Sequence, residues 1–319
     1  MTQSDSVDIR KTVAAPPGTD AGKDTGKDAG KAADPIEPVS RTRAVVRRFR
    51  SNRSAVVGAL LLLAIIVVTA AAPLIAPYGP AQVDISDRLS GPTAEHWLGT
   101  DTLGRDTLTR LMHGGRVSLA AAALAVAIAT GIGLPLGLVS GYFGGIVDWL
   151  LDRAADILMA FPAIILTIAI IAMVGPGLTT AMVSLGIVYA PRMYRVVRGS
   201  TLEVRREVYI EASTSIGTPH LTILRKRVLP NIMPAALVQL SFLLASALLA
   251  EVTVSLLGLG ALPPTASWGS MLGQAFLEMR TNPSLAVYPG IAIAIATLCF
   301  NLIGDGLRDA FGRETRKAS

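Results

Sequence analysis

The chain has 319 residues, of which 51% are hydrophobic and only 16% are charged, and its mean hydropathy is +0.52. Because charged residues normally make up about a quarter of a soluble protein, this composition indicates a membrane protein and excludes a soluble enzyme, a disordered chain and a fibrous chain. The net charge is +6. The basic residues flank apolar runs, so they predict orientation in a membrane and not binding to nucleic acid.

The first 53 residues contain the near-repeat DAGKDTGKDAGKAADP. They hold too few apolar side chains to form a core, so we expect residues 1–53 to be a disordered basic tail in the cytoplasm. Residues 54–76 follow, 23 positions without a charge. A helix of that length rises about 34 Å and crosses a hydrocarbon layer of about 30 Å, which predicts a first transmembrane anchor.

Further uncharged runs predict five more membrane spans. Residues 157–191 carry no charge over 35 positions, too long for one crossing at helical rise. Gly175-Pro176-Gly177 supplies a turn that divides this region into a helical hairpin. The six expected spans are 54–76, 117–140, 150–174, 178–198, 228–259 and 285–303.

The basic residues also predict the topology. With the N-terminus in the cytoplasm, twenty-four Lys and Arg residues lie inside and five outside, which is a strong positive-inside bias. Six spans then return the C-terminus to the cytoplasm. The expected segments are the tail 1–53, the anchor 54–76, an extracytoplasmic segment 77–116, a core membrane domain 117–311 with a cytoplasmic loop 199–231, and a cytoplasmic C-terminal tail 312–319.

The loop 199–231 contains a pattern typical of a short helix. Its apolar and small residues are spaced at i, i+3, i+4 and i+7, which predicts one narrow face for a partner. The residues of this face are Tyr209, Ala212, Ser213 and Ile216. The alternative is a solvated basic loop with incidental helices, and the spacing alone favours neither.

Turn residues predict where the helices of this loop begin and end. Gly217 is suited to cap the C-terminus of the first helix. Thr218 is expected to cap a second helix whose first position is Pro219. Pro230 is expected to limit that second helix. Two short helices joined by a glycine elbow would form a rigid protrusion at the membrane surface.

The same loop carries a sequence motif. It consists of Glu211-Ala212-Ser213, Gly217 six residues after the glutamate, and Leu229-Pro230. This motif resembles the EAA loop of the permease subunits of binding-protein-dependent ABC importers. Two positions depart from the usual pattern, since Ser213 replaces a second alanine and Arg227 replaces an isoleucine. The dipeptide/oligopeptide branch of the family commonly has a basic residue just before its Leu-Pro-Asn.

Other stretches resemble the second permease subunit of that branch, and the resemblance covers residues 40–311. The matching stretches are His96-Trp97-Leu98-Gly99-Thr100-Asp101, Gly104-Arg105-Asp106, Gly258-Leu259-Gly260, Pro263-Pro264, Trp268-Gly269, Met271-Leu272, Asn301 and Gly304-Asp305-Gly306-Leu307-Arg308-Asp309. Phe311-Gly312-Arg313 departs from the Asp-Pro that is usual there.

The resemblance implies an all-α integral membrane protein with six transmembrane helices and the type I ABC importer permease fold. It implies an inner-membrane subunit that forms half of a pathway for dipeptides or oligopeptides. The implied partners are a homologous second permease, one or two cytoplasmic ATPase subunits, an extracytoplasmic solute-binding protein and membrane lipid. The chain itself would be no enzyme and bind no cofactor, because ATP and Mg²⁺ would be held by the ATPase subunits.

The resemblance also implies the residues that couple this chain to the ATPase. In the family, the EAA helices sit in a cleft of the ATPase subunit. The coupling residues would be Glu211, Ala212, Ser213, Gly217, Leu229 and Pro230, with Arg205 and Arg206 as flanking contacts. The chain contains no Gly-x-x-x-x-Gly-Lys-Ser/Thr sequence, the loop that cradles phosphates in ATPases.

Ionisable residues near the spans admit two interpretations. A buried charge costs about 2.5–3.5 kcal/mol on insertion scales, so Glu251 either lines the pathway or pairs with a neighbouring helix. Asp148, Asp152 and Asp156, with Arg153 able to pair with Asp156, predict a charge cluster at a cytoplasmic helix end. The three histidines are far apart in the sequence and support no metal site.

Two alternatives to a peptide importer remain open at this point. One is a secondary transporter or channel working alone, which would be expected to show inverted repeats or coupling-ion groups at midplane. The other is an importer of the same type whose cargo is a nickel complex, glutathione or haem. The segment 77–116 is either a docking surface for the binding protein or partner permease, or a polar cap over the pathway.

Overall fold

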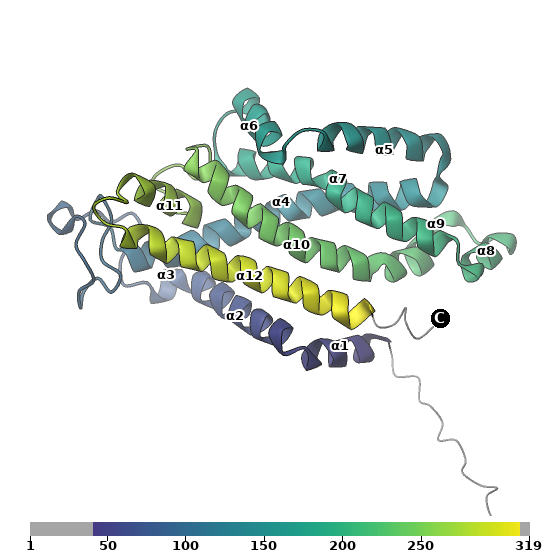
Figure 1. The fold of residues 1–319 in the computed structure, drawn as a ribbon, viewed down its shortest axis with the longest axis horizontal. Coiled ribbons are helices and arrows are strands. Elements are labelled where there is room, and N and C mark those ends of the chain that lie inside the picture. Colours follow the sequence, from purple (N-terminus) through teal and green to yellow (C-terminus); the bar gives the residue numbers. More distant parts are fainter. Residues whose placement is uncertain (1–40, 313–319) are drawn as a thin grey trace, which may run out of the picture. The chain divides into compact units, whose positions relative to one another are not determined.

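A computed structural model of the chain describes residues 41–312 (Figure 1), and every regular element in that range is a helix. The expected all-α fold is therefore confirmed. Residues 1–40 of the expected tail and 313–319 at the C-terminus lie outside the described residues. The helices are α1 (Arg41–Ser51), α2 (Arg53–Ala70), α3 (Ala72–Ile75), η1 (Ile85–Asp87), α4 (Thr107–Phe143), α5 (Gly145–Met159), α6 (Ala163–Val174), α7 (Leu178–Arg205), α8 (Val208–Ser215), α9 (His220–Ile223), η2 (Leu224–Val228), α10 (Leu229–Leu256), α11 (Trp268–Leu277) and α12 (Ser284–Gly312).

Within residues 41–312, four helical stretches are long and apolar enough to cross a membrane. They are α2, α4, the continuous stretch His220–Leu256 that joins α9, η2 and α10, and α12. A fifth span arises if α5 and α6 cross as one broken pair. Helix α7 has 28 residues, but the arginines in its second half make it more polar than these. Helix length and composition thus give four or five spans, compatible with the expected fold but short of the count of six.

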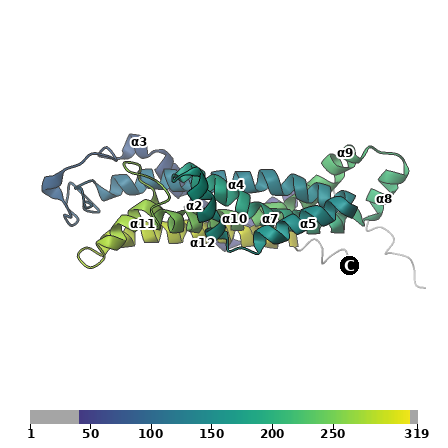
Figure 2. The ribbon, with the colours of Figure 1, turned by 90° about the horizontal axis from the view of Figure 1, so that it is seen from above.

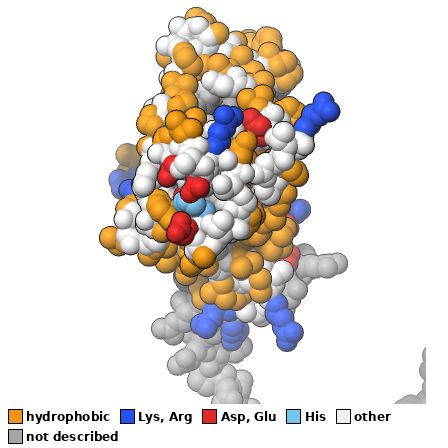
Figure 3. All heavy atoms as spheres, turned by 90° about the vertical axis from the view of Figure 1, so that its left-hand side faces the viewer, with side chains coloured by type: hydrophobic (Ala, Val, Ile, Leu, Met, Phe, Trp, Pro, Cys, Tyr) orange, Lys and Arg blue, Asp and Glu red, His pale blue; other side chains and the backbone are white. Residues whose placement is uncertain are grey.

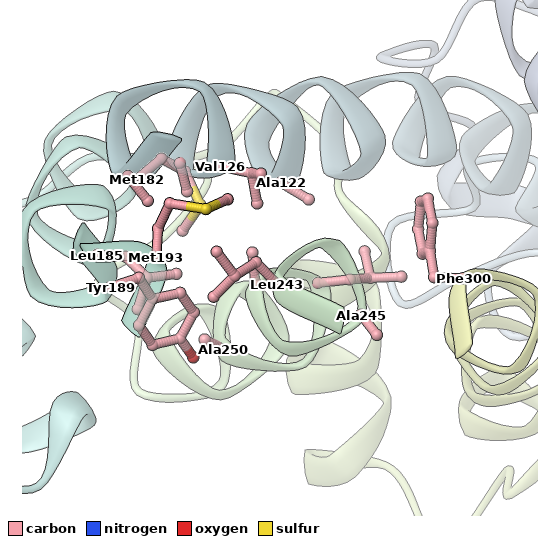
Figure 4. Close-up of a cluster of buried hydrophobic side chains, with 14 of the residues drawn as sticks. Ala122, Val126, Met182, Leu185, Tyr189, Met193, Leu243, Ala245, Ala250 and Phe300 are labelled. Atoms are coloured by element: carbon pink, nitrogen blue, oxygen red, sulfur yellow. The ribbon is translucent and has the colours of Figure 1, made fainter. Parts of the chain in front are cut away.

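Helices α4, α7 and α10 form the centre of the bundle. Figure 4 shows Ala122 and Val126 of α4 facing Met182 and Leu185 of α7, with Leu243 of α10 beside them. All five side chains are buried in one apolar cluster. Dispersion and close packing, rather than exclusion of water, hold such contacts together within lipid.

The backbones of α4 and α7 approach each other at a row of glycines. A Cβ atom on Gly133 would lie 2.5 Å from the carbonyl oxygen of Ala190, and one on Gly137 would lie 2.7 Å from that of Tyr194. On the other helix, a Cβ on Gly186 would lie 2.7 Å from the carbonyl oxygen of Ala125. These distances leave no room for a side chain, so both helices need glycine where they touch.

The expected span 150–174 is wrong as a single helix. Helix α5 ends at Met159, α6 begins at Ala163, and the two are bent by 89°. Pro162 explains the break, because it has no N–H group for the helical ladder and it disfavours helical geometry at Phe161 before it. The expected turn after this region is present, since Gly175 and Gly177 both have positive φ values of 113° and 147°.

The expected disorder over residues 1–53 is wrong for residues 41–51, which form α1. Arg48 Nη1 donates a hydrogen bond to the carbonyl oxygen of Ala310 at 3.5 Å. The ring of Phe49 packs so close to α12 that a Cβ on Gly306 would lie 3.2 Å from it. Packing against α12 therefore supplies the apolar contacts that this polar segment lacks within itself.

Two further boundaries differ from the expected ones. Helix α4 begins at Thr107, so the last ten residues of the expected extracytoplasmic segment 77–116 are helical. Asp106 starts this helix by accepting a hydrogen bond from the backbone N–H of Thr109 at 2.7 Å. Helix α11 lies between the expected spans 228–259 and 285–303, and a capping box of Ser267 and Ser270 begins it.

The long helices place two sets of short elements at opposite ends of the bundle. Figure 1 shows α8 and α9 at one end and α3 and α11 at the other. The perpendicular view in Figure 2 shows the same separation along the long direction of the bundle. We call these the α8 end and the α11 end.

Substitution of Gly133 by alanine is expected to destabilise the bundle by about 1–3 kcal/mol, because the new Cβ would meet the backbone of α7. Gly131→Ala is the matched control, since nothing lies within 4 Å of the Cβ position at Gly131 in the same helix. Thermal unfolding in detergent measures both. If the two variants have the same midpoint of thermal unfolding, the close contact at Gly133 does not contribute to stability, and the prediction is wrong.

Candidate functional site

Helix α8 ends in a glycine cap of the Schellman type. Gly217 has a φ of +76°, and its N–H donates to the carbonyl oxygen of Thr214 at 3.0 Å. The N–H of Thr218 donates to the carbonyl oxygen of Ser213 at 3.1 Å. This pair of bonds satisfies the last carbonyl groups of the helix. The predicted role of Gly217 as a C-terminal cap is confirmed.

The two boundaries expected for the second helix are wrong. Helix α9 begins at His220 with Pro219 as the residue before it, and no side chain caps it, so Thr218 is not the cap. The helix does not stop at Pro230 but continues through η2, a π turn, into α10. Pro230 directly follows this π turn, where the regular ladder has already changed to bonds five residues apart, as in the bond from the Leu229 N–H group to the Leu224 carbonyl oxygen.

The face that α8 presents to solvent differs from the expected one. Glu211 and Ala212 are exposed, and Ile216 just beyond the helix is 79% exposed. Ser213, expected on the same face, is only 1% exposed. Ile210 and Ser213 turn inward together because they are three residues apart on one side of the helix. The exposed surface is therefore centred on Glu211, Ala212 and Ile216.

Hydrogen bonds fasten α8 to the beginning of α10 through four residues, Tyr209, Ser213, Arg227 and Asn231, which we call the Arg227 network. The Ser213 hydroxyl donates to the carbonyl oxygen of Tyr209 and accepts a bond from Arg227 Nη1. Arg227 Nη1 also donates to that carbonyl oxygen at 3.3 Å. Asn231 Nδ2 donates to the Tyr209 hydroxyl at 2.9 Å and to the Arg227 carbonyl oxygen at 2.7 Å. The motif alone did not indicate these contacts.

A second contact joins α9 to the end of α4. The hydroxyl of Tyr142 lies 2.9 Å from Nδ1 of His220, and the ring of Phe143 meets the same imidazole edge-on with centroids 5.9 Å apart. Tyr142 is buried at the C-terminal end of α4. The protrusion of α8 and α9 is thus held to two of the long central helices.

The other residues of the motif lie around this protrusion. Arg205 is the last residue of α7 and Arg206 follows it, and both are exposed in the short connection to α8. Leu229 is half-buried and Pro230 exposed at the first turn of α10. The structure therefore places the motif residues in two groups, one on α8 and its cap and one at the start of α10.

Ion pairs join α5 to α7 near the α8 end. Arg198 donates two hydrogen bonds to the carboxylate of Asp148, from Nε at 2.5 Å and from Nη2 at 2.8 Å. Asp156 is paired with Arg153 at 2.7 Å, as predicted, and also with Arg195 of α7. Two-pronged arginine pairs are geometrically specific. They hold the polar second half of α7 against α5, a pairing across helices that the spacing of the aspartates did not indicate.

Glu251 is fully buried between three helices. Its Oε1 accepts a hydrogen bond from the Ser255 hydroxyl at 2.9 Å, and its Oε2 accepts one from the Ser118 hydroxyl of α4 at 3.1 Å. The Ser118 hydroxyl accepts in turn from the backbone N–H of Trp268, the first residue of α11, at 3.0 Å. These contacts join α10, α4 and the beginning of α11.

Acidic residues surround a histidine at the α11 end, as Figure 3 shows. Nδ1 of His96 lies 2.9 Å from the carboxylate of Asp106, and Nε2 lies 3.9 Å from that of Asp87. Nearby, hydrogen bonds from Ser86 lower the pKa of the exposed Asp84 carboxyl. Within residues 41–312, no group of three His, Cys, Asp or Glu side chains has the geometry of a metal site.

A cavity of about 610 Å³ opens at the same end, between α4, α7 and the loop that precedes α11. Its lining is mostly apolar and includes Leu124, Leu178 and Met182. The cavity wall also includes two polar residues of α4, His113 and Arg116. Such a hollow on the face of a single chain can form one side of a larger space shared with a partner.

These features define a polytopic helical membrane protein with a short exposed helix at one end. Residues 133–317 match the family described as the binding-protein-dependent transport system inner membrane component, and residues 40–92 match the N-terminal transmembrane domain of oligopeptide transport permease C. The chain belongs to the first of these families, and it is the permease subunit of an ABC importer. The description of this family is that of a transport component of the inner membrane.

Similar proteins support this assignment over most of the chain. The dipeptide transport system permease protein DppC of Alkalihalophilus pseudofirmus is 38% identical over 277 residues, which is 87% of this chain and 91% of that protein. The glutathione transport system permease protein GsiD of Pectobacterium atrosepticum is 40% identical, covering 83% and 88%. GsiD of Escherichia coli O157:H7 is 42% identical with the same coverage.

A solved structure shows the fold. An inward-facing structure of the MetNI methionine ABC transporter superimposes with a TM-score of 0.53 at 22% sequence identity. The match covers 66% of this chain and 96% of the MetNI chain. The type I ABC importer permease fold expected from the sequence is confirmed.

Substitution of Glu251 by alanine is expected to destabilise the bundle by about 1–3 kcal/mol, because buried hydroxyl donors lose their acceptor. Glu278→Ala is the control, because Glu278 is the half-buried residue that follows α11 and its carboxylate accepts a hydrogen bond from the exposed Thr281 hydroxyl at 2.9 Å. Thermal unfolding measures stability, and protease cleavage near α11 reports whether its beginning has loosened. If both variants unfold like the unsubstituted protein, Glu251 does not hold α11 in place.

Proposed function

We propose that this chain forms half of the pathway of an ATP-driven importer for dipeptides or oligopeptides, and that α8 docks on an ATPase subunit. The observation that carries the proposal is the exposed face of α8, where Glu211 and Ala212 stand beside the apolar side chain of Ile216. An exposed apolar side chain next to a carboxylate, on a helix with a defined end at Gly217, is suited to a cleft in a folded partner.

The remaining coupling residues have positions consistent with this role. Arg205 and Arg206 are exposed beside α8 and would contact acidic groups at the edge of the ATPase cleft. Leu229 and Pro230 begin α10, the helix that receives the motion. Ser213 faces inward, so its part in coupling would be to hold α8 and not to touch the ATPase.

The proposal includes the partners and the orientation of the chain. A homologous permease would supply the other half of the pathway, with the open cavity beside Arg116 on the shared side. An extracytoplasmic binding protein would deliver the cargo, and ATP and Mg²⁺ would be bound by one or two ATPase subunits. Both termini and α8 would lie in the cytoplasm, which the twenty-four basic residues on that side support.

A second candidate cargo is glutathione, itself a small peptide. The identity to GsiD, at 40–42% over 265 residues, is slightly higher than the identity to the DppC relative, at 38% over 277 residues. A nickel complex or haem has no comparable support among these relatives. Reconstitution of the permeases, ATPase subunits and binding protein in liposomes would decide the cargo, by measuring whether a dipeptide or reduced glutathione stimulates ATP hydrolysis.

Glu211→Lys is expected to abolish ATP-driven uptake while membrane insertion stays intact, because it reverses the charge on the docking face. Removing one partner of a buried charge pair costs about 2–5 kcal/mol of binding free energy, which would lower the affinity of α8 for the ATPase subunit at least tenfold. Uptake of labelled dipeptide or glutathione into proteoliposomes measures the effect. Glu203→Lys, an exposed acidic residue near the end of α7, is the control. Normal uptake by the Glu211→Lys complex would contradict the docking role.

A further inference from the structure

The two positions at which this loop departs from the usual family motif contact each other. Ser213 replaces a small apolar residue and Arg227 replaces an aliphatic one, and the Arg227 guanidinium donates to the Ser213 hydroxyl. The same guanidinium donates to the carbonyl oxygen of Tyr209, which also accepts the Ser213 hydroxyl. The two polar residues therefore satisfy each other at a place where an alanine and an isoleucine would make only apolar contact.

This contact crosses from the docking helix to the long helix. Tyr209 and Ser213 belong to α8, whereas Arg227 lies in η2, the π turn that leads directly into α10. Asn231, one turn into α10, bonds to both Tyr209 and Arg227. A π turn inserts an extra residue into a helix and is often found at functional positions. Here it carries the arginine that reaches α8.

The chemistry of the contact distinguishes it from the apolar packing beside it. Ile210 of α8 is buried in the same apolar cluster as Ile223 and Val228. Apolar contact is non-directional, so it fixes the orientation of α8 less tightly than a hydrogen bond does. A guanidinium has donors in a rigid plane, and hydrogen bonds from a charged donor are stronger than those between neutral groups. Arg227 therefore sets the direction and register of α8 relative to α10.

We propose that Arg227 is a positioning residue that makes α10 follow α8 when the ATPase moves the docking helix. The inference rests on the proposed docking of α8. Without the arginine, α8 would still fold, end at its glycine cap and dock. Its displacement would then be taken up by sliding along the apolar contact, and α10 would move less for each ATP hydrolysed. The expected defect is loss of coupling and not loss of assembly.

The test uses the full complex in proteoliposomes, with a labelled dipeptide and reduced glutathione as the two cargo probes. Arg227→Met keeps an unbranched side chain next to the backbone and removes the guanidinium with its donors. Arg225→Met is the matched control, because Arg225 is exposed in the same π turn, and within residues 41–312 no hydrogen bond or ion pair holds it. We expect Arg227→Met to lower the cargo moved per ATP hydrolysed about tenfold and Arg225→Met to leave it unchanged.

Two serine variants separate the contact from general changes in α8. Both Ser213 and Ser215 donate back to the carbonyl oxygen four residues earlier, but only Ser213 also accepts from Arg227. Ser213→Ala should lower the coupling ratio, which is the amount of cargo moved per ATP hydrolysed, and Ser215→Ala should leave that ratio unchanged. Adding Ser213→Ala to Arg227→Met should have little further effect, because both remove the same interaction.

Docking is measured separately, by crosslinking a cysteine introduced at Ile216 to the ATPase subunit. A preserved crosslink with a reduced coupling ratio in Arg227→Met supports the inference. An unchanged ratio, or loss of the crosslink or of assembly in both Arg227→Met and Ser213→Ala, overturns it. If the unsubstituted complex gives no crosslink at residue 216 and no ATP-driven uptake, the proposed function itself fails, which is a different result from a normal complex that tolerates Arg227→Met.

Discussion

The close contact of α4 with α7 is the constraint on which the rest of the structure depends. Within lipid there is no water to exclude between helices, so association requires backbones that fit closely. Gly133 and Gly137 bring α4 against the backbone of α7, and Gly186 does the same from α7. α10 completes this centre with side chains such as Leu243. Every site described above is attached to one of these three helices.

At the α8 end, each polar contact joins a surface element to that central group. Arg198 and Asp148 hold α5 against α7, His220 meets Tyr142 at the end of α4, and Arg227 joins α8 to α10. The protrusion is therefore attached to the long helices by directed hydrogen bonds. At the α11 end, Glu251 makes the corresponding junction between α10, α4 and α11. The same helix α10 thus carries a polar junction near each of its ends.

The parts of the fold that the sequence predicted well depend on local chemistry. Long uncharged runs must be helical in lipid, and Gly217 favours the left-handed conformation that ends α8. The errors came from the effects of packing and of single prolines. Pro162 divides a run that looks continuous, whereas Pro230 follows a π turn in a helix that continues past it. The helix α1 depends on contact with α12, which lies more than two hundred residues away in the sequence.

By itself the sequence determined the class of the protein, its membrane character, the position of the loop 199–231 and the family motif in it, because each follows from composition or from residues close together in the chain. Only the tertiary structure decided which side chains of that loop face outward and which hold it in place. Ser213 and Arg227 are fourteen residues apart, and nothing in their spacing indicates that they touch. Their contact exists because α8 folds back on the π turn at the start of α10.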